Sequence, residues 1–443
     1  MARSSFAPIP NRDTLNKFLT ATDARQQIAA GTLSCETLLR QCLAHIDERE
    51  ADIGAWQMMG REAAIACAQR LDRAPGKALL HGIPLGVKDI IEVAGMPTRN
   101  GSNIFINAPN ASVDAASVAI ARTAGANILG KTVTTELAGF TPGRTRNPQH
   151  LGHTPGGSSS GSAAAVADGH VPLALGTQTA GSVIRPAAYC GVFGFKPSFG
   201  LMPLDGIKMQ SATLDTLGVF ARCAEDLALW YAAMTGAKTI PDGPQPRALR
   251  INIITNLMVR ADAEMGLALT NAGEVLAMAG VQIHEIKLPA IFNDAGNDQR
   301  TIQLAEMATH YAREHREHRD LLSPQLVNLL DEGASIADTT YRAAMQRCDR
   351  LREQTDQLFG DCDAWLMPSA TGAAPAGLNA TGDPIFNRLA TVLHQPAINV
   401  PHYRTKAGLP LGLQLVGGRQ QDEKLLAVAQ QIQIIFQAQK KPF

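Results

Sequence analysis

Apolar residues recur along the chain with two spacings, one typical of helices and one typical of short buried strands. Residues 14–49 predict two helices, and 34–50 places apolar side chains on one helical stripe: Leu38, Leu39, Cys42, Leu43 and Ile46. Residues 113–124 predict a further helix with Asp114 as its cap. Strands are expected at 126–129, 191–196 and 250–255, and 301–359 is predicted to be almost entirely helical.

Helices and strands that alternate in this way are typical of an α/β protein with helical layers on both faces of a mixed sheet. We therefore expect an α/β/α layered domain. The clearest break in composition is Pro241–Pro246, PDGPQP, which is predicted to link the first half of the chain to the second. The sequence contains no repeat of fixed period and no long low-complexity segment.

One block, residues 156–196, combines two glycine-rich turns that contain serine with an apolar stretch between them. Glycine lacks a Cβ atom, so such turns can approach a substrate closely and point consecutive amides into a small volume. The intervening stretch at 162–176 carries too many apolar residues for a solvated linker. The run from Thr177 to Ser182 is therefore predicted to cradle an anion, with Ser182 at its end.

Several separated motifs resemble those of the amidase signature family and follow in the same order. The block supplies GGSSSGSAAAVA, PLALGTQTAGSVIRPA and CGVFGFKP, and HGIPLGVKD at 81–89 is similar to the family's lysine motif. The resemblance continues through 125–132, 214–222, 363–375 and 408–418. It implies a single domain over residues 1–443, with a signature core at about 70–235 and a helical, pocket-forming segment at about 247–443.

The resemblance implies three catalytic side chains, Lys88, Ser158 and Ser182. Ser182 would be the nucleophile, Ser158 a bridging serine after a non-proline cis peptide bond from Gly157, and Lys88 the base. Serine is a weak nucleophile and needs such a proton acceptor. Because an ordinary lysine has a pKa of about 10.4, the base must be buried to be neutral at pH 7. The implied oxyanion hole consists of the backbone N–H groups of Thr179, Ala180, Gly181 and Ser182.

Three positions depart from the family's usual pattern. Gln178 replaces a common aspartate, Ala180 replaces a glycine, and Arg185 lies three residues after Ser182, where many members place arginine two residues after. We expect the brace between aspartate and arginine to be absent or replaced by an amide hydrogen bond from Gln178. No catalytic group is lost, so activity is expected, with a specificity unlike that of the commonest members.

Two motifs suggest other chemistry and are rejected on context. Residues 125–132, GANILGKT, fit the letters of a phosphate-binding loop, but they follow a predicted helix and enter a strand, the reverse of what that loop requires. We expect a turn there with Lys131 at its rim. Residues 157–161 form GxSxG around Ser159, but no later histidine lies in the distinctive context that an α/β-hydrolase would need.

The cysteines and histidines do not indicate a metal site. The chain has seven cysteines without a CxxC pair or a Cys/His cluster of metal-ligand spacing. We expect reduced thiols, with Cys190 packed rather than nucleophilic. His310, His315 and His318 alternate with arginines and are predicted to lie on a solvated helix face. Neither a metal nor a cofactor is expected.

Composition narrows the class of partners. The chain has 443 residues, of which 45% are hydrophobic and 18% charged, enough for a large core. The charges of the 40 basic and 40 acidic residues cancel. The chain therefore has no surplus of positive charge that would indicate binding to nucleic acid. The N-terminal residues lack a continuous apolar segment, and nowhere do 18 apolar residues run together. We therefore expect a cytoplasmic protein without a membrane association.

The resemblance leaves the substrate open. Pocket walls are implied at 136–147, 300–345 and 371–387. Phe140, Met307 and Phe386 would make the cavity apolar, although each is equally compatible with the core.

We predict an amidase that hydrolyses the C–N bond of a small, largely apolar amide or carbamate through a serine acyl-enzyme, as a monomer or homodimer. The family's range includes urethanase, aryl acylamidase and esterase activities. The alternative is the glutaminase (A-type) subunit of a tRNA-dependent amidotransferase, which works with partner subunits. The altered turn GTQTAGSVIR and the lack of surplus basic charge favour the stand-alone enzyme. Retention of Lys88, Ser158 and Ser182 disfavours a relative that keeps only the fold.

Overall fold

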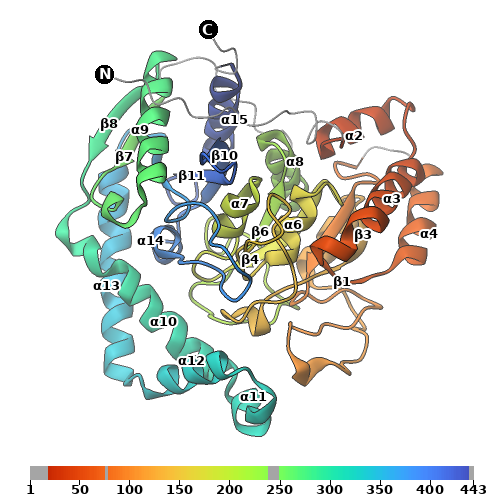
Figure 1. The fold of residues 1–443 in the computed structure, drawn as a ribbon, viewed down its shortest axis with the longest axis horizontal. Coiled ribbons are helices and arrows are strands. Elements are labelled where there is room, and N and C mark those ends of the chain that lie inside the picture. Colours follow the sequence, from red (N-terminus) through yellow and green to blue (C-terminus); the bar gives the residue numbers. More distant parts are fainter. Residues whose placement is uncertain (1–17, 75–77, 238–248, 439–443) are drawn as a thin grey trace.

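The computed structural model describes residues 18–74, 78–237 and 249–438. Their strands form one mixed sheet of 11 strands in the order β1-β3-β2-β4-β6-β5-β10-β11-β9-β7-β8, which runs through the middle of the molecule (Figure 1). The predicted linker Pro241–Pro246 lies outside the described residues. The strands are β1 (Trp56–Met59), β2 (Pro84–Lys88), β3 (Asn127–Thr132), β4 (Leu173–Gln178), β5 (Phe193–Lys196), β6 (Thr216–Ala221), β7 (Arg250–Ile254), β8 (Gln282–Ile286), β9 (Ala364–Pro368), β10 (Ala397–Arg404) and β11 (Pro410–Val416).

In the described part of the chain, fourteen α-helices surround the sheet, and five short 3-10 turns lie in the connections between elements. None of these helices is both long and apolar enough to cross a bilayer. The helices are α2 (Ala21–Ala29), α3 (Cys35–Ile53), α4 (Arg61–Asp72), α5 (Ala116–Thr123), α6 (Ser160–Ala167), α7 (Ile184–Cys190), α8 (Ala224–Thr235), α9 (Ala263–Met278), α10 (Ala295–His310), α11 (Ala312–Glu317), α12 (Pro324–Ser335), α13 (Asp338–Phe359), α14 (Ile385–Val392) and α15 (Asp422–Ala438).

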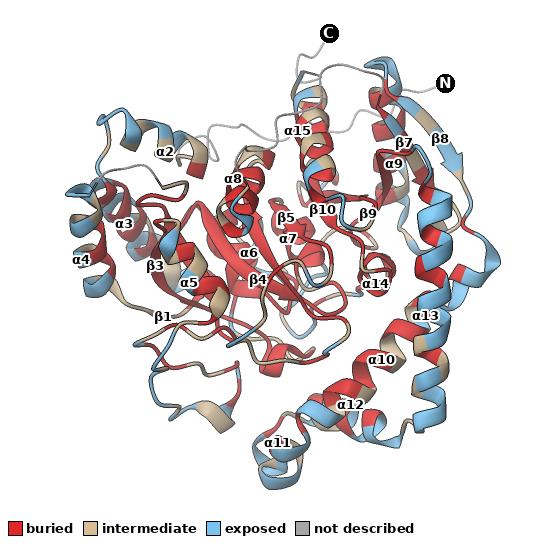
Figure 2. Ribbon diagram, turned by 180° about the vertical axis from the view of Figure 1, so that it is seen from behind, coloured by how far each residue is buried: buried red, intermediate tan, exposed pale blue. Residues whose placement is uncertain are grey.

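Both faces of the sheet are covered, as the predicted α/β/α layers require. Successive residues of β4 point to opposite faces. Leu173 and Leu175 join a core cluster with residues of α5, α8, α9 and α15, whereas Ala174 joins a cluster with residues of α3, α4, α6 and α7. Figure 2 shows the result: the central strands and α6 are buried, and exposure is concentrated on the outer helices.

The sheet brings the ends of two strands together. β2 pairs in parallel with β4, with Val87 opposite Leu175. β2 ends at Lys88 and β4 ends at Gln178. Because the carboxyl ends of parallel strands meet at one edge of a sheet, Lys88 lies beside the turn that follows Gln178.

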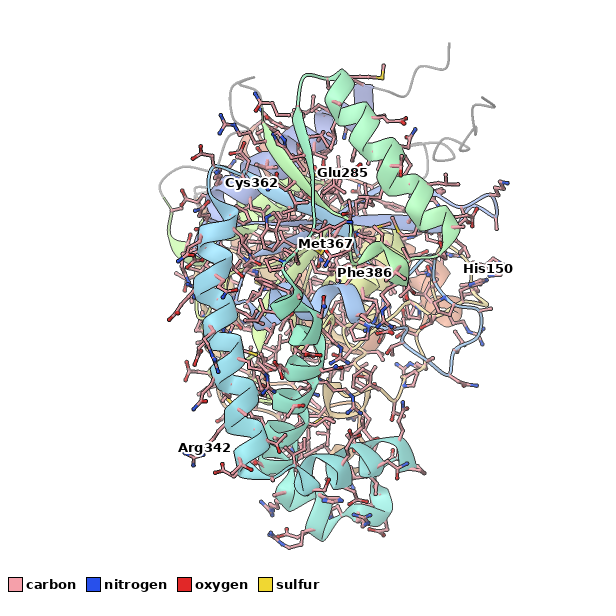
Figure 3. The ribbon with its side chains drawn as sticks, turned by 90° about the vertical axis from the view of Figure 1, so that its left-hand side faces the viewer. His150, Glu285, Arg342, Cys362, Met367 and Phe386 are labelled. Carbon is pink, nitrogen blue, oxygen red and sulfur yellow. The ribbon has the colours of Figure 1, made fainter. Side chains whose placement is uncertain are left out.

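Helices α10 to α13 extend beyond one side of the sheet (Figure 1), and they confirm the predicted helical run at 301–359. They attach to the rest through a buried cluster that includes Leu137 and Tyr311. In Figure 3, Arg342 points away from α13, whereas Met367 of β9 and Phe386 of α14 lie in the interior. On the outer helices His310 is exposed and His315 and His318 are partly exposed, as expected.

Helix α3 forms where the apolar stripe predicts it. The side chain of Ser34 accepts a hydrogen bond from Thr37 N, which caps the helix, and all five stripe residues are buried. The helix expected at 113–124 is shorter, and Asp114 does not cap it. The carboxylate of Asp114 instead accepts a hydrogen bond from Ala94 N and pairs with Arg122.

Lys131 does not lie at the rim of a turn, which corrects the sequence-based expectation. The strand expected at 126–129 is Asn127–Thr132, so Lys131 falls inside β3 and is fully buried. Its amine pairs with the buried carboxylate of Asp89 at 2.9 Å. Asp89 follows Lys88 directly, so this ion pair fixes the end of β2. The strands expected at 191–196 and 250–255 are β5 and β7, each slightly shorter.

Gly161 in α6 is predicted to tolerate no side chain. A Cβ atom there would lie 2.3 Å from Ala55 O and 2.4 Å from Val133 N, both backbone atoms. Gly161→Ala should therefore lower the free energy of unfolding by about 3 kcal/mol. Gly266 in α9 is the matched control, because the nearest atom to its Cβ would be Met258 Cε at 3.9 Å. Gly266→Ala should raise stability by up to about 1 kcal/mol. Urea unfolding of both variants measures the difference, and equal effects would contradict this packing.

Candidate active site

Lys88 and Ser158 meet in the interior, as the resemblance implied. The Lys88 amine lies 2.8 Å from Ser158 Oγ and 2.8 Å from Thr177 Oγ1. Lys88 is fully buried and Ser158 is 2% exposed. Lys88 ends β2, Thr177 belongs to β4, and Ser158 lies just before α6. Two neighbouring strands and the start of one helix therefore place the three groups.

Burial lowers the pKa of Lys88 from its ordinary 10.5 to about 7, and the charge of Asp215 opposes this effect. The cause is the loss of water around the ammonium form. The two hydroxyl partners are neutral and only partly replace that solvation. Near neutral pH a large fraction of Lys88 is therefore a free amine that can accept a proton from Ser158.

Asp215 is a residue of the candidate site that the sequence analysis did not identify. Its carboxylate is buried and accepts hydrogen bonds from Thr179 Oγ1 at 2.5 Å, Gln210 N at 2.7 Å and Ser211 N at 3.0 Å. It therefore anchors the first residue after β4. The available signal was an acidic residue inside the apolar stretch LDTLGVFA, since a buried carboxylate requires partners.

Two hydrogen bonds hold the peptide units around Ser158. The Gly157–Ser158 bond is cis, as the resemblance implied. Ser158 O accepts from Thr135 N at 3.1 Å, and Gly157 O accepts from Arg185 Nη2 at 2.7 Å. Because Arg185 belongs to α7, which follows the turn bearing Ser182, the second bond ties the two serine-bearing turns together.

Amide hydrogen bonds from Gln178 replace the carboxylate–arginine brace, one of the two outcomes expected. Gln178 Oε1 accepts from Val183 N at 2.9 Å and Ile184 N at 3.0 Å, which satisfies N–H groups at the start of α7. Gln178 Nε2 donates to Thr391 Oγ1 at 3.0 Å. The guanidinium of Arg185 reaches Gly157 O and Thr381 Oγ1 instead.

Each carbonyl of the turn at 179–181 accepts a hydrogen bond. The bonds are Gln299 Nε2 to Thr179 O at 2.8 Å, Thr391 Oγ1 to Ala180 O at 2.9 Å and Arg185 N to Gly181 O at 3.0 Å. In a trans peptide unit the C=O and the N–H point in opposite directions, so these bonds also fix the N–H groups of Ala180, Gly181 and Ser182. Within the described ranges, no protein group accepts a hydrogen bond from those N–H groups.

Ser182 differs from the two other nucleophile candidates in its surroundings. It is partly exposed in the turn before α7. Ser159 is buried, and its Oγ donates to Thr177 O at 3.2 Å. Cys190 is also buried, its Sγ lies 3.4 Å from Pro155 O, and burial raises the pKa of its thiol far above the ordinary value. Cys190 is therefore packed and unreactive, as expected.

The family model Amidase matches residues 37–426 of this chain. The chain belongs to the amidase family. A curated relative, the A-type subunit of glutamyl-tRNA(Gln) amidotransferase from Roseiflexus sp. (strain RS-1), is 33% identical over 94% of this chain and 96% of its own. The crystal structure of an amidase is 28% identical, with a TM-score of 0.86 over 94% of this chain and 99% of that one. A chain from a vestigial protein complex that reveals the evolutionary origins of an s-triazine catabolic enzyme is 27% identical, with a TM-score of 0.85 over 95% and 99%.

Polar side chains surround the turn of this amidase. Gln299 Nε2 also donates to Gln303 Oε1 at 3.2 Å, Gln303 Nε2 to Gln210 Oε1 at 2.9 Å, and Gln210 Nε2 to Ala138 O at 3.2 Å. Three buried glutamines thus connect the turn with the segment at 136–147 that was expected as a pocket wall.

The apolar residues named as candidates for the pocket do not make the surroundings of the turn apolar. Met307 and Phe386 are buried core residues, and Phe140 is partly exposed.

Cavity size alone does not locate the site. A cavity of about 10 Å³, enough for roughly one water, is lined by Thr177, Thr179 and Asp215. A cavity of about 590 Å³ lies among α2, α8, β10 and α15, and none of Lys88, Ser158 and Ser182 lines it. The smaller cavity adjoins the candidate site, because Thr177 contacts the Lys88 amine and Asp215 accepts a hydrogen bond from Thr179.

One group of three side chains within the described ranges has the spacing of metal ligands: His45, Asp168 and His170. Asp168 accepts a hydrogen bond from Arg49 at 3.0 Å and lies 3.1 Å from His170 Nε2. His170 Nδ1 accepts from Trp56 Nε1 at 3.2 Å. A guanidinium on the carboxylate opposes a bound cation, and the contacts account for the group as packing between α3 and the end of α6.

Proposed function

We propose that this amidase cleaves the C–N bond of its substrate through an acyl-enzyme on Ser182. The observation that carries the proposal is the 2.8 Å contact between the buried Lys88 amine and Ser158 Oγ. Ser158 Oγ can pass a proton from Ser182 to Lys88 because a hydroxyl both donates and accepts. Ser182 Oγ then attacks the carbonyl carbon, and the proton returns along the same path to the leaving nitrogen. Water hydrolyses the acyl-enzyme by the reverse sequence.

The N–H groups of Thr179, Ala180, Gly181 and Ser182 are proposed to stabilise the tetrahedral oxyanion. A preorganised donor acts without reorganisation at the moment of reaction, and loss of one costs about a hundred- to a thousandfold in rate. The hydrogen bonds on the Thr179, Ala180 and Gly181 carbonyls support this role, because they hold three peptide units in fixed orientations. Gln299 and Thr391 are therefore positioning residues that act through the turn.

Thr391→Val tests the positioning role. The valine keeps the volume but removes the hydroxyl that donates to Ala180 O, so kcat should fall by about 10- to 100-fold with little change in KM. Thr391→Ser restores the donor and should recover most of kcat.

Thr355→Val is the matched control, because Thr355 is a buried threonine of α13 whose hydroxyl donates to Leu351 O. It should lower the melting temperature without lowering kcat. A purely structural role for Thr391 would predict equal effects of both valine variants on kcat.

The nucleophile and the base are tested together by covalent labelling. A fluorophosphonate should modify Ser182, mapped by peptide mass spectrometry, and Ser182→Ala should abolish both labelling and turnover. The labelling rate should rise with pH through about 7, the pKa of Lys88, because the protonated amine cannot accept a proton. Lys88→Ala should lose several orders of magnitude in rate and the pH dependence. An adduct on Ser159 or Cys190 would refute the assignment.

The comparisons favour an amidotransferase subunit over a hydrolase of small apolar amides or carbamates. The Roseiflexus relative and further curated relatives at 28–33% identity are all A-type subunits of glutamyl-tRNA(Gln) amidotransferase. The polar surroundings of the turn point in the same direction. We therefore propose glutamine as the first amide to test, with partner subunits that take up the released ammonia. The solved amidase at 28% identity supports the stand-alone enzyme as the second candidate.

Rates on two substrates separate these readings. Ammonia release from glutamine and p-nitroaniline release from butyryl p-nitroanilide are measured with the chain alone and with the tagged chain isolated from its own cells, accompanied by any subunits it binds. The amidotransferase hypothesis predicts a kcat/KM for glutamine that is at least tenfold higher than that for the anilide. It also predicts a further increase in the isolated assembly. A higher kcat/KM for the anilide with the chain alone would favour the stand-alone enzyme. Ser182→Ala controls for contaminating hydrolases.

A further inference from the structure

The two edge strands of the sheet, β1 and β8, differ in how the chain covers them. An edge strand presents backbone N–H and C=O groups that can pair with a strand of another molecule. At β1, side chains bind these groups. Trp56 N donates to the carboxylate of Glu50 at 2.8 Å, and Trp56 O accepts from Arg144. The β1 edge is therefore protected by the chain itself.

Strand β8 forms the opposite edge of the sheet. It lies at the outer margin of the molecule in Figure 1, and Figure 3 views this side with Glu285 labelled. β8 pairs in parallel with β7, and Gln282 N donates to Leu249 O at 2.7 Å. At its other end, Ile286 O accepts from Thr255 N at 3.0 Å. Because alternate residues of a strand bond the same neighbour, the even-numbered residues of β8 face β7.

The odd-numbered residues of β8 and of the segment after it turn their backbone groups away from the sheet. Within the ranges described above, no group of the chain forms a hydrogen bond with the N–H or C=O of Ile283, Glu285 or Lys287. The side chain of Ile283 packs against the core cluster that includes residues of α9, and that of Ile286 against the cluster that includes residues of α13. Both faces of β8 are therefore covered, and its edge is open.

Two opposite charges lie on one face of this edge. Glu285 and Lys287 alternate with Ile283, so all three side chains lie on the face that α9 covers. Glu285 and Lys287 are exposed, and neither has an ion-pair partner among the described residues. A lysine on an edge strand usually discourages pairing with another chain. Here, however, an antiparallel partner strand can place a carboxylate opposite the lysine.

Charge complementarity selects a second copy of β8 as that partner and fixes the register. If a two-fold axis passes through Ile286, Glu285 of each copy lies opposite Lys287 of the other. An axis through Glu285 would oppose two carboxylates, which is unfavourable. An axis through His284 would leave both charges without an opposite charge. Beyond the paired residues, Pro289 has no N–H group and ends the ladder.

We propose that β8 pairs antiparallel with β8 of a second copy of this chain, with Ile286 on the two-fold axis. The sheet then continues through both molecules. Residues that face each other in a hydrogen-bonded pair of antiparallel strands exchange two hydrogen bonds, and their Cβ atoms lie about 4.5–5.5 Å apart. Glu285 and Lys287 of the other copy can therefore form an ion pair. The contact is smaller than the roughly 1,600 Å² of a typical stable interface, so the dimer should dissociate at micromolar concentrations.

Charge reversal at the edge tests both the surface and the register. Sedimentation equilibrium of the purified chain should show a monomer–dimer equilibrium whose dissociation constant rises with sodium chloride. Glu285→Lys or Lys287→Glu alone places like charges opposite each other and should raise the dissociation constant by about tenfold or more. An equimolar mixture of the two variants should form heterodimers, because every opposite pair again has unlike charges. Glu62→Lys, an exposed position of α4 near the other end of the sheet, is the control and should change nothing.

Hydrogen exchange locates the contact, because the amides of Glu285 and Lys287 should exchange more slowly in the dimer than in either single variant. A chain that stays monomeric up to about 100 μM refutes the proposal. A dimer that is insensitive to both reversals, or a mixture of the variants that does not associate, also refutes it. Protection of β8 by a different protein would instead identify this edge as the docking site of another subunit. The proposed amide chemistry is independent of all these outcomes, and unchanged melting temperatures would show that the variants fold.

Discussion

The contact between the buried amine of Lys88 and the hydroxyl of Ser158 constrains the rest of the site. An ammonium group in the interior loses its hydration, and the hydroxyls of Ser158 and Thr177 replace only part of it. The parallel pairing of β2 with β4 brings the amine to the sheet edge where the turn begins. Asp215 works in the opposite direction, because its charge favours the ammonium form. The pKa near 7 is the balance of these two effects.

The turn after β4 depends on residues that lie far away in the sequence. Its carbonyls are held by Gln299 from α10 and Thr391 from α14. Gln178 is joined to Thr391, and so the start of α7 is anchored to the same helix α14. A glycine-rich turn has little conformational preference of its own. Its orientation is therefore set by the second half of the chain, although the motif that defines it lies entirely in the first half.

This division explains what could be predicted from the sequence. The pairing of Lys88 with Ser158 could be predicted because their motifs are local and specific. The apolar stripe of α3 could be predicted because its period is regular. The position of Lys131 was predicted wrongly because β3 extends beyond its apolar residues. A buried lysine can be predicted only once its partner, Asp89, is known. The support from Gln299 and Thr391 has no local signal, since each is an isolated polar residue in a helix, and its role appears only in three dimensions.

The same reasoning accounts for the error about the surroundings of the turn. Met307 and Phe386 were candidates for an apolar cavity because an apolar residue in the sequence is equally compatible with a pocket wall and with the core. Both are core residues. What remains near the turn is a chain of glutamines ending at Arg388. Gln299 joins two functions in one side chain, because its Nε2 holds Thr179 O and its Oε1 accepts from Arg388. Because Oε1 and Nε2 belong to one planar amide, the contact with Arg388 also fixes the orientation in which Nε2 donates to the turn.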